Sequence, residues 1–296
     1  MRPGRIAIAA GFVFTASSVF AQGSYWISDF NGSSAGYRVL RNDDAIAVVQ
    51  LMLLQTGDRV VVDDPAGRIV VVDDRNVVHD ITAATSPFVV PEYGDPPGLL
   101  TNLRDWISSW WETRGEQSTT TMAAVSKAGL EPELSAASAG PNFLRAGPRD
   151  LHVSWAGGIG PFSVELIDGS GSPIASRSGI DGRSTVLPGL DLRPGGYRLA
   201  VAAGGAHHVA DIVVVGDSEL PETGRALLAQ ELPERLGLGY LAMFLAAYEN
   251  WRFEALQLAH AYDLAELRDD LRAGAMDGID GGALALPVDP DRRDVE

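Results

Sequence analysis

Short apolar runs separated by turn residues fill two long stretches of the chain, and this pattern gives way to a helical period near its end. Between residues 24 and 93, short β-branched or aromatic runs such as Arg59–Val62 and Arg68–Val72 are separated by turn residues. Similar runs lie between Gly and Pro turns in residues 143–216. From Pro221 onward the apolar positions recur at helical spacing. The pattern therefore predicts two all-β modules followed by short helices.

The second β stretch has the strand lengths and turn spacing of an Ig-like β-sandwich, although no Cys pair is present to link its sheets. We expect a mainly β protein with α-helices. Its segments are, in order, a signal peptide (1–21), a small β-module (22–98), an amphipathic Trp-rich helix (99–114), a flexible linker rich in Ser, Thr, Ala, Gly and Pro (115–142), the Ig-like β-sandwich (143–216), a short helical element (217–274) and a disordered acidic tail (275–296).

Two helical segments carry large apolar side chains that are candidates for docking onto a partner. In the Trp-rich helix, Trp106 and Trp110 fall on one stripe and Trp111 lies beside it. This stripe either packs on the β-module or forms an exposed interface, because large apolar patches are seldom left in water. In the C-terminal helical element the corresponding candidates are Trp251, Phe253 and Tyr262.

The first residues have the three parts of a secretory signal. Arg2 and Arg5 provide the positive region, residues 6–20 are mostly apolar, and Val19-Phe20-Ala21 offers small residues at both cleavage positions. No later segment approaches 18 apolar residues, so no stable membrane insertion is expected after cleavage. We predict an exported protein, with the periplasm as the expected location and secretion from the cell as the alternative.

The net charge of −16 excludes one class of partner. Phosphate backbones and anionic lipid surfaces repel a chain of this charge, so nucleic acid is not expected to bind. The sequence contains no Cys, which rules out a disulfide framework and a lipid anchor on Cys.

The most regular short motif is GDRVVVDDPAGRIVVVDD, residues 57–74. Its repeated Asp-Asp pairs could hold a cation, or they could close two successive strands. A Ca²⁺ site needs six to eight converging oxygens, whereas adjacent Asp residues in a strand point to opposite faces. Asp63-Asp64-Pro65-Ala66-Gly67 has the residue types of a tight turn, so we interpret both Asp pairs as turns.

No set of residues with catalytic or metal-binding spacing is found. Gly216-Asp217-Ser218 follows a strand as in GDSL hydrolases, but the Asp-x-x-His that activates such a serine is missing before His260. The five His residues show no metal-ligand spacing. The sequence therefore predicts a protein that is not an enzyme and uses no cofactor or metal.

The first β-module resembles a FecR-like domain, found in exported bacterial proteins and in periplasmic sensors that regulate sigma factors. The resemblance rests on WISDFNGS (Trp26–Ser33), YRVLR (Tyr37–Arg41), LQTGDRV (Leu54–Val60) and GRIVVV (Gly67–Val72). A sigma-regulating member has a cytoplasmic segment and a membrane span before this domain, whereas a cleavable signal is predicted here. The later strands with an Arg-Gly-Thr segment are also absent. The regulatory role is therefore not carried over.

The C-terminal part adds a second resemblance. A β-sandwich followed by WRFEALQ (Trp251–Gln257) is similar to the tail of some exported FecR-like proteins, which implies a domain order and no activity. Taken together, the sequence favours a protein-binding adaptor, or a signalling or scaffold component, that binds another envelope protein. The alternatives are a cell-wall or glycan-binding module, in which Tyr25, Trp26 and Tyr37 would stack on sugars, and a hydrolase that uses Ser218.

Overall fold

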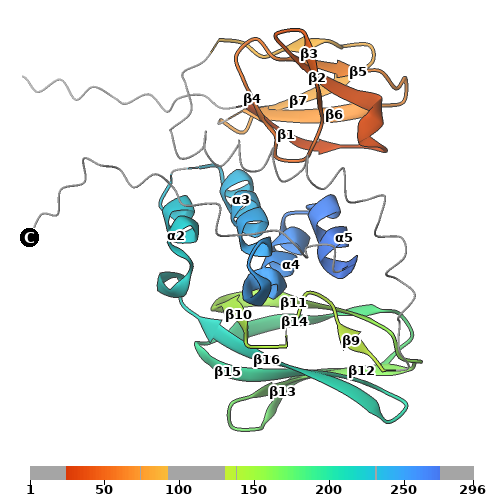
Figure 1. The fold of residues 1–296 in the computed structure, drawn as a ribbon, viewed down its shortest axis with the longest axis vertical. Coiled ribbons are helices and arrows are strands. Elements are labelled where there is room, and N and C mark those ends of the chain that lie inside the picture. The colour runs from red at the N-terminus through yellow and green to blue at the C-terminus, as the bar shows by residue number, and fades with distance from the viewer. Residues whose placement is uncertain (1–24, 74, 93–130, 138, 231, 274–296) are drawn as a thin grey trace, which may run out of the picture.

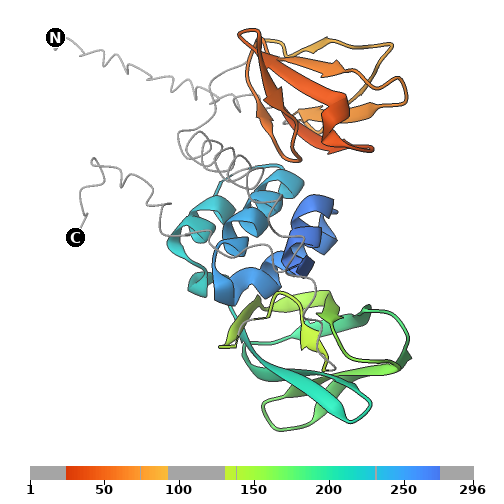
Figure 2. The same cartoon turned by 45° about the vertical axis from the view of Figure 1, so that its right-hand side comes forward.

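The computed structural model describes residues 25–92 and 131–273, with the exception of 74, 138 and 231. The chain is mainly β and is arranged in three layers, with one β-module at each end and a layer of helices between them (Figure 1). A view turned by 45° shows the same order of layers (Figure 2). The predicted signal peptide, the Trp-rich helix, the tail and most of the linker lie outside the described residues.

The first β-module consists of two four-stranded sheets. One has the order β4-β1-β6-β7 and the other β3-β2-β5-β8. Their inward side chains, including Ile27, Val39 and Val71, form a core from which water is excluded. The strands are β1 (Tyr25–Phe30), β2 (Tyr37–Arg41), β3 (Asp44–Ala47), β4 (Leu53–Leu54), β5 (Arg59–Val62), β6 (Arg68–Asp73), β7 (Val78–Thr82) and β8 (Phe88–Val89), with a 3-10 turn at Ser34–Gly36.

The twinned acidic motif carries the chain from one sheet to the other. Strands β5 and β6 are consecutive in sequence but belong to different sheets. Between them, the Asp64 side chain accepts a hydrogen bond from the Ala66 N–H at 2.9 Å, and a Cβ on Gly67 would come within 2.8 Å of Val62. Asp63 instead pairs with Arg38 on β2, with an Arg38 Nε to Asp63 Oδ2 distance of 2.6 Å.

The second acidic turn is also closed by local hydrogen bonds. The Asp73 carboxylate is buried and accepts from the Arg75 and Val77 backbone N–H groups at 3.0 and 2.8 Å. Such Asp turns satisfy backbone donors that would otherwise be left unpaired. The turn interpretation thus accounts for the partners of Asp64 and Asp73, whereas the Asp63 side chain forms an ion pair with strand β2.

The second β-module is a sandwich of five strands against three. Its sheets have the orders β10-β16-β15-β12-β13 and β14-β11-β9. Trp155 is buried between them, as expected for an aromatic residue of an early strand. The strands are β9 (Glu133–Leu134), β10 (Asn142–Arg145), β11 (Gly147–Ala156), β12 (Phe162–Asp168), β13 (Pro173–Ile180), β14 (Ser184–Leu192), β15 (Gly195–Ala203) and β16 (Ala206–Val215).

The sandwich begins earlier than predicted. Strand β9 lies inside the predicted linker and pairs with β11, where Leu134 opposes Trp155. Leu134 is 3% exposed, so it belongs to the core of the sandwich. The linker prediction was wrong at this point because a two-residue strand among Ser and Ala residues leaves almost no periodic signal.

The C-terminal helices form the middle layer. Helix α3 is buried on nearly all sides, which is typical of a helix enclosed by other elements rather than lying on a surface. The elements are a 3-10 turn η3 (Asp217–Glu219), α2 (Glu222–Leu228), α3 (Glu234–Ala246), a 3-10 turn η4 (Glu249–Trp251), α4 (Arg252–Ala261) and α5 (Ala265–Ala273).

The first β-module is attached to α3 through residues far apart in the sequence. Trp26 and Leu51 belong to the same buried cluster as the apolar side chains of α3, α4 and α5. The Tyr240 hydroxyl donates to the Leu51 carbonyl at 3.0 Å, and Gly239 lies directly beneath the Leu51 side chain. Arg235 donates to the Ser28 carbonyl at 3.2 Å. The first β-module and the C-terminal helices therefore share one buried core.

Candidate functional site

Helix α4 joins the helical layer to the sandwich. The Phe253 side chain is fully buried and belongs to the core of the sandwich rather than to that of the helices. Trp251 is 4% exposed and packs against Phe143 of β10, with ring centroids 5.1 Å apart. The segment WRFEALQ (Trp251–Gln257) is thus the region in which helix α4 packs against the sandwich of the same chain.

The buried positions of Trp251 and Phe253 correct the prediction that they form an exposed docking surface. A partner could reach them only by separating α4 from β10 and β11. Tyr262 is partly buried and also serves the fold, because its hydroxyl donates to Glu234 Oε1 at 2.9 Å. Burial and this hydrogen bond raise the pKa of Tyr262 to about 12. Trp106, Trp110 and Trp111 lie outside the described residues.

A buried ion pair fixes α4 against the strands. Glu254 is fully buried, and its Oε2 accepts from Arg149 Nη1 of β11 at 2.6 Å. A second Arg149 nitrogen contacts Oε1 at 3.3 Å, and the Arg145 backbone N–H donates to Oε2 at 3.2 Å. Burial raises the pKa of the Glu254 carboxyl, while the Arg149 guanidinium opposes that rise. The carboxylate is held by a bidentate, charge-assisted contact.

One helical turn further, the Gln257 side chain forms the backbone hydrogen bonds that a neighbouring strand would form with β11. Its side-chain Oε1 accepts from the His152 backbone N–H at 2.8 Å, and its Nε2 donates to the His152 carbonyl at 2.9 Å. The amide therefore satisfies both backbone groups of one residue on β11, as a neighbouring strand would. This contact places the His152 side chain beside α4.

A stacked histidine pair forms next to this contact. The imidazoles of His152 and His260 lie 4.0 Å apart, with an interplanar angle of 7°. Arg272 Nη2 lies 3.1 Å from His260 Nε2. A guanidinium can only donate, so Nε2 must accept and the proton of neutral His260 is on Nδ1. The contact between Arg272 and His260 thus requires an uncharged His260.

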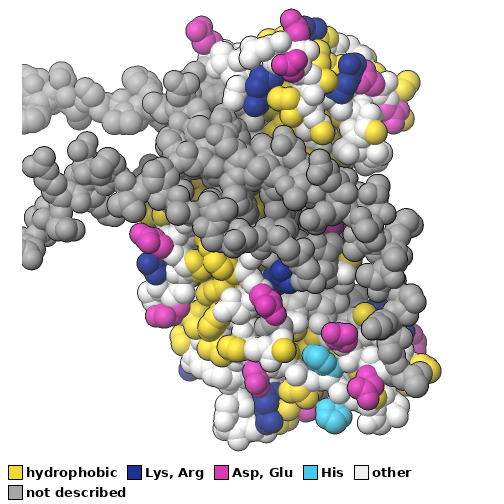
Figure 3. Space-filling model, viewed as in Figure 1, with side chains coloured by type: hydrophobic (Ala, Val, Ile, Leu, Met, Phe, Trp, Pro, Cys, Tyr) yellow, Lys and Arg dark blue, Asp and Glu magenta, His cyan; other side chains and the backbone are white. Residues whose placement is uncertain are grey.

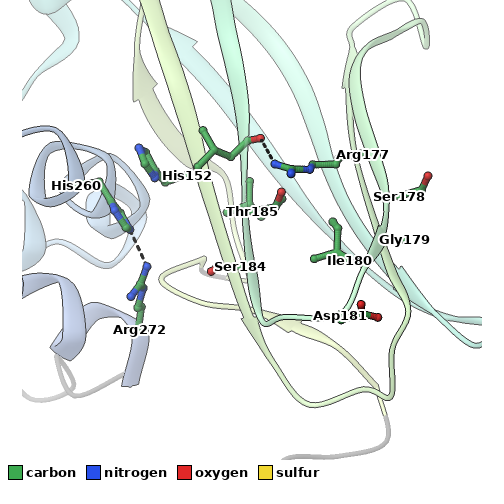
Figure 4. Close-up of a pocket in the computed structure, with 12 residues that line it drawn as sticks. His152, Arg177, Ser178, Gly179, Ile180, Asp181, Ser184, Thr185, His260 and Arg272 are labelled. Atoms are coloured by element: carbon green, nitrogen blue, oxygen red, sulfur yellow. Dashed lines mark hydrogen bonds between the residues drawn. The ribbon is translucent and has the colours of Figure 1, made fainter.

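The histidine pair borders a pocket between the sandwich and the helices (Figure 4). The cavity has a volume of about 620 Å³. Figure 4 shows His152, His260 and Arg272 on one side of it and Arg177, Ile180 and Asp181 from β13 and the turn after it on the other. The hydroxyl residues Ser184 and Thr185 of β14 complete the wall. This is the cavity that we take as the candidate binding site.

The histidine pair predicts acid sensitivity. Burial, with His152, Arg272 and Arg268 nearby, lowers the pKa of His260 to about 4. Burial also lowers the pKa of His152, opposed by Asp150. The unfolded chain takes up these protons near pH 6.5, whereas folded His260 does so only near pH 4. The free energy of unfolding is therefore highest above about pH 6.5, and it falls as the pH drops from 6.5 toward 4.

We expect His260→Gln to flatten the fall in unfolding free energy between pH 6.5 and 4. The change should be about 1–2 kcal/mol, below the full equivalent of the pKa shift because the ring is only half buried. Urea unfolding at several pH values measures it. Exposed His207 on β16 gives the control, since His207→Gln should keep the slope of the original protein. Equal slopes for both variants would contradict the assignment.

The other sequence candidates are not brought together. His260, the only histidine after Ser218, stacks on His152 and bonds Arg272 instead. No group of three His, Asp or Glu residues suited to a metal is found among the described residues. No helix in the same part of the chain is long and apolar enough to cross a membrane. Tyr25, Trp26 and Tyr37 are all buried, so they form no platform for sugars.

Sequence reasoning missed the pocket residues. His152 and His260 lie in a strand and a helix far apart in the sequence, and Arg177 and Arg272 show no motif spacing. The one available signal was the segment WRFEALQ, whose Glu254 and Gln257 bind β11 and thereby place the histidine pair.

Comparisons with known proteins add little to this description. No family model and no curated protein sequence matches the chain. Among solved structures, CopC from Methylosinus trichosporium OB3b is 19% identical over 31% of this chain and all of its own, with a TM-score of 0.24. An immunoglobulin domain, Dpr1 IG1 in complex with DIP-eta IG1, is 12% identical over 29% of this chain and 97% of its own, with a TM-score of 0.20. Neither likeness supports an argument about function.

Proposed function

We propose that the protein is an exported, non-enzymatic adaptor that binds an extended segment of another envelope protein along strand β13. The observation that carries the proposal is the free edge of this strand. Strand β13 lies at the end of the five-stranded sheet and, in the described part of the chain, pairs only with β12. Nearly all of its side chains are exposed on both faces, and Ile174 is 43% exposed.

An open strand edge is a template for a further strand. Its unpaired N–H and C=O groups can form main-chain hydrogen bonds with an extended peptide, while neighbouring side chains select the sequence. Proteins usually protect such an edge with charges, prolines or bulges. Strand β13 has one proline, at its start, one charged residue, Arg177, and a register shift against β12 near each end, so the regularly paired part of its open edge is residues 175–177.

The architecture suits an adaptor. Because the helical layer shares its core with the first β-module and forms the junction with the sandwich, a partner bound on β13 is held at a fixed position relative to the first module. The expectation of export rests on the signal-like residues 1–21 and on the FecR-like resemblance of residues 22–98. The adaptor is favoured over the glycan-binding alternative because the aromatic residues suggested for sugar stacking are in the core.

Proline substitutions on β13 test the proposal. Neighbouring N–H groups of a strand point to opposite sides, so one of Ala175 and Ser176 directs its N–H to β12 and the other directs it outward. The outward-facing proline should change stability by less than about 1 kcal/mol and should abolish capture of the partner. The proline at the position whose N–H bonds β12 should destabilise the sandwich, and this loss of stability shows which of the two positions faces β12.

The measurement is co-purification from the envelope fraction with the tagged chain lacking residues 1–21. The proposal requires that a specific protein retained by the original chain be lost with the stable proline variant. Residue Val209, which is 45% exposed on the interior strand β16, supplies a surface control, because Val209→Ser should leave capture unchanged. Full retention of the same partner by the stable proline variant would overturn the proposal.

A further inference from the structure

The pocket lies at the end of the strand edge to which the adaptor proposal assigns the partner. Arg177, Ile180 and Asp181 belong to the last part of β13 and to the turn that follows it, and they form one wall (Figure 4). A segment that adds to β13 therefore reaches the cavity at one of its ends. The volume of about 620 Å³ is within the range of small-ligand pockets, which is about 300–1,000 Å³.

We propose that this pocket binds a carboxylate carried by the extended segment, with Arg177 and Arg272 as its ligands. The inference rests on the proposed function and adds to it the chemical group that is recognised. The two guanidiniums come from opposite walls of the cavity, one from β13 in the sandwich and one from α5 in the helical layer.

Both guanidiniums have donors to spare. Arg177 forms no ion pair within the described residues, and its hydrogen bond is a 3.5 Å contact with the Val186 carbonyl. Arg272 bonds the uncharged His260, and its distance to the Asp269 carboxylate is 4.0 Å. Its Nε is buried without a partner among the described residues. Each guanidinium carries five N–H donors, and a carboxylate can accept two of them side by side.

The remaining charges limit the ligand to a single negative charge. Arg268 is already paired with Asp263 at 3.2 Å and lies 3.7 Å from Asp269. Asp150, near His152, accepts from the Gly189 backbone N–H at 2.8 Å. The exposed carboxylate of Asp181 lines the same cavity and the Asp269 carboxylate lies 4.0 Å from Arg272, so both reduce the positive charge of the two guanidiniums. The lining thus favours a monoanion over a doubly charged phosphate.

The other walls fit the body of a peptide residue. Ile180 and Val186 provide apolar surface, while Ser184 provides a hydroxyl group. Pockets of this kind bind mainly through apolar contact and use a few polar groups to orient the ligand. On the face seen in Figure 3, acidic and basic side chains are interspersed, and the chain as a whole carries −16. An acidic group is repelled by most of this protein, so a local pair of guanidiniums with unused donors confers selectivity.

N-acetylalanine, which mimics the end of a peptide, is the probe for the carboxylate. We expect it to shift the imidazole NMR signals of His152 and His260 in the chain lacking residues 1–21, with saturation at millimolar concentration, on the order expected for so small a ligand. N-acetylalanine amide, which lacks the charge, should leave these signals unchanged. Inorganic phosphate should bind more weakly than N-acetylalanine.

Arginine variants locate the site. Arg177→Gln and Arg272→Gln should each weaken binding of N-acetylalanine at least about ten-fold, because each removes a charge-assisted contact. Arg193 has a side chain that is 84% exposed and does not line the cavity, so Arg193→Gln should bind like the original chain. Arg177→Gln is decisive, since this residue holds no part of the histidine pair. Equal binding of acid and amide, or no loss in either pocket variant, would overturn the inference.

The two proposals can fail separately. If a partner is captured and depends on the β13 edge, but N-acetylalanine does not bind, the adaptor stands and the carboxylate inference fails. If N-acetylalanine binds through Arg177 and Arg272 while no partner is captured, the pocket accepts a free carboxylate and the adaptor proposal fails. Loss of partner capture in Arg177→Gln together with acid-specific binding supports both.

Discussion

Replacing Glu254 with alanine is expected to lower the free energy of unfolding by about 3–5 kcal/mol, the cost of breaking a buried ion pair by removal of one partner. Arg149 would be left with its charge in a partly buried position, where its side chain is 17% exposed. The Arg145 backbone N–H would lose its acceptor as well. Equilibrium urea unfolding, followed by tryptophan fluorescence, measures the change.

Two controls separate burial from charge. Asp80 pairs with Arg68 at 2.7 Å on the surface, where both side chains are more than half exposed, so Asp80→Ala should cost less than about 1 kcal/mol. The double variant Arg149→Met with Glu254→Leu should be more stable than Glu254→Ala alone, because no unpaired charge remains. A loss of less than about 1.5 kcal/mol in Glu254→Ala would show that water reaches the pair.

The same substitution at two positions of α3 is expected to have opposite effects. Gly239→Ala should destabilise the protein by a net of about 1–2 kcal/mol, because a Cβ would lie 2.3 Å from Leu51 Cδ1 and the fully buried leucine must change its rotamer. At Gly237 the nearest atom would be 3.4 Å away, an ordinary contact. Gly237→Ala should therefore stabilise the protein by about 0.5–1 kcal/mol through helix propensity.

Urea unfolding of both variants gives the difference. Hydrogen exchange then locates it, since backbone amides of the first β-module should exchange faster in Gly239→Ala than in Gly237→Ala if Leu51 anchors the module. Equal stabilities of the two variants would mean that Leu51 moves aside without cost and that the module is held elsewhere.

The strands were predictable because their signal is local. The run Arg68–Val72 has four consecutive β-branched residues after Arg68 and is bounded by Gly67 and Asp73, so the residues of β6 can be read without knowledge of its neighbours. The sheet in which each strand is placed was not predictable. Strands β5 and β6 have nearly the same sequence, yet they belong to opposite sheets, because that choice depends on β1 and β2.

The role of the helices was misread for a physical reason. Apolar residues such as Trp251 and Phe253 must be covered, but the sequence does not tell whether the covering surface belongs to another protein or to the same chain. Here it belongs to β10 and β11. The pocket could not be predicted from the sequence for a related reason. His152 and His260 come together only because Gln257 binds the backbone of β11.

The shared helical core also has a consequence for the order of assembly. Trp26 and Leu51 are made early on the ribosome, yet the surface that covers them belongs to α3 and the helices after it, near the end of the chain. The first β-module can form its own sheets at once, but among the described residues the side chains that cover Trp26 and Leu51 emerge only with the last helices. A truncation at residue 217 would therefore remove this cover from the opening strands, and the earliest part of the protein would be the last to reach its final stability.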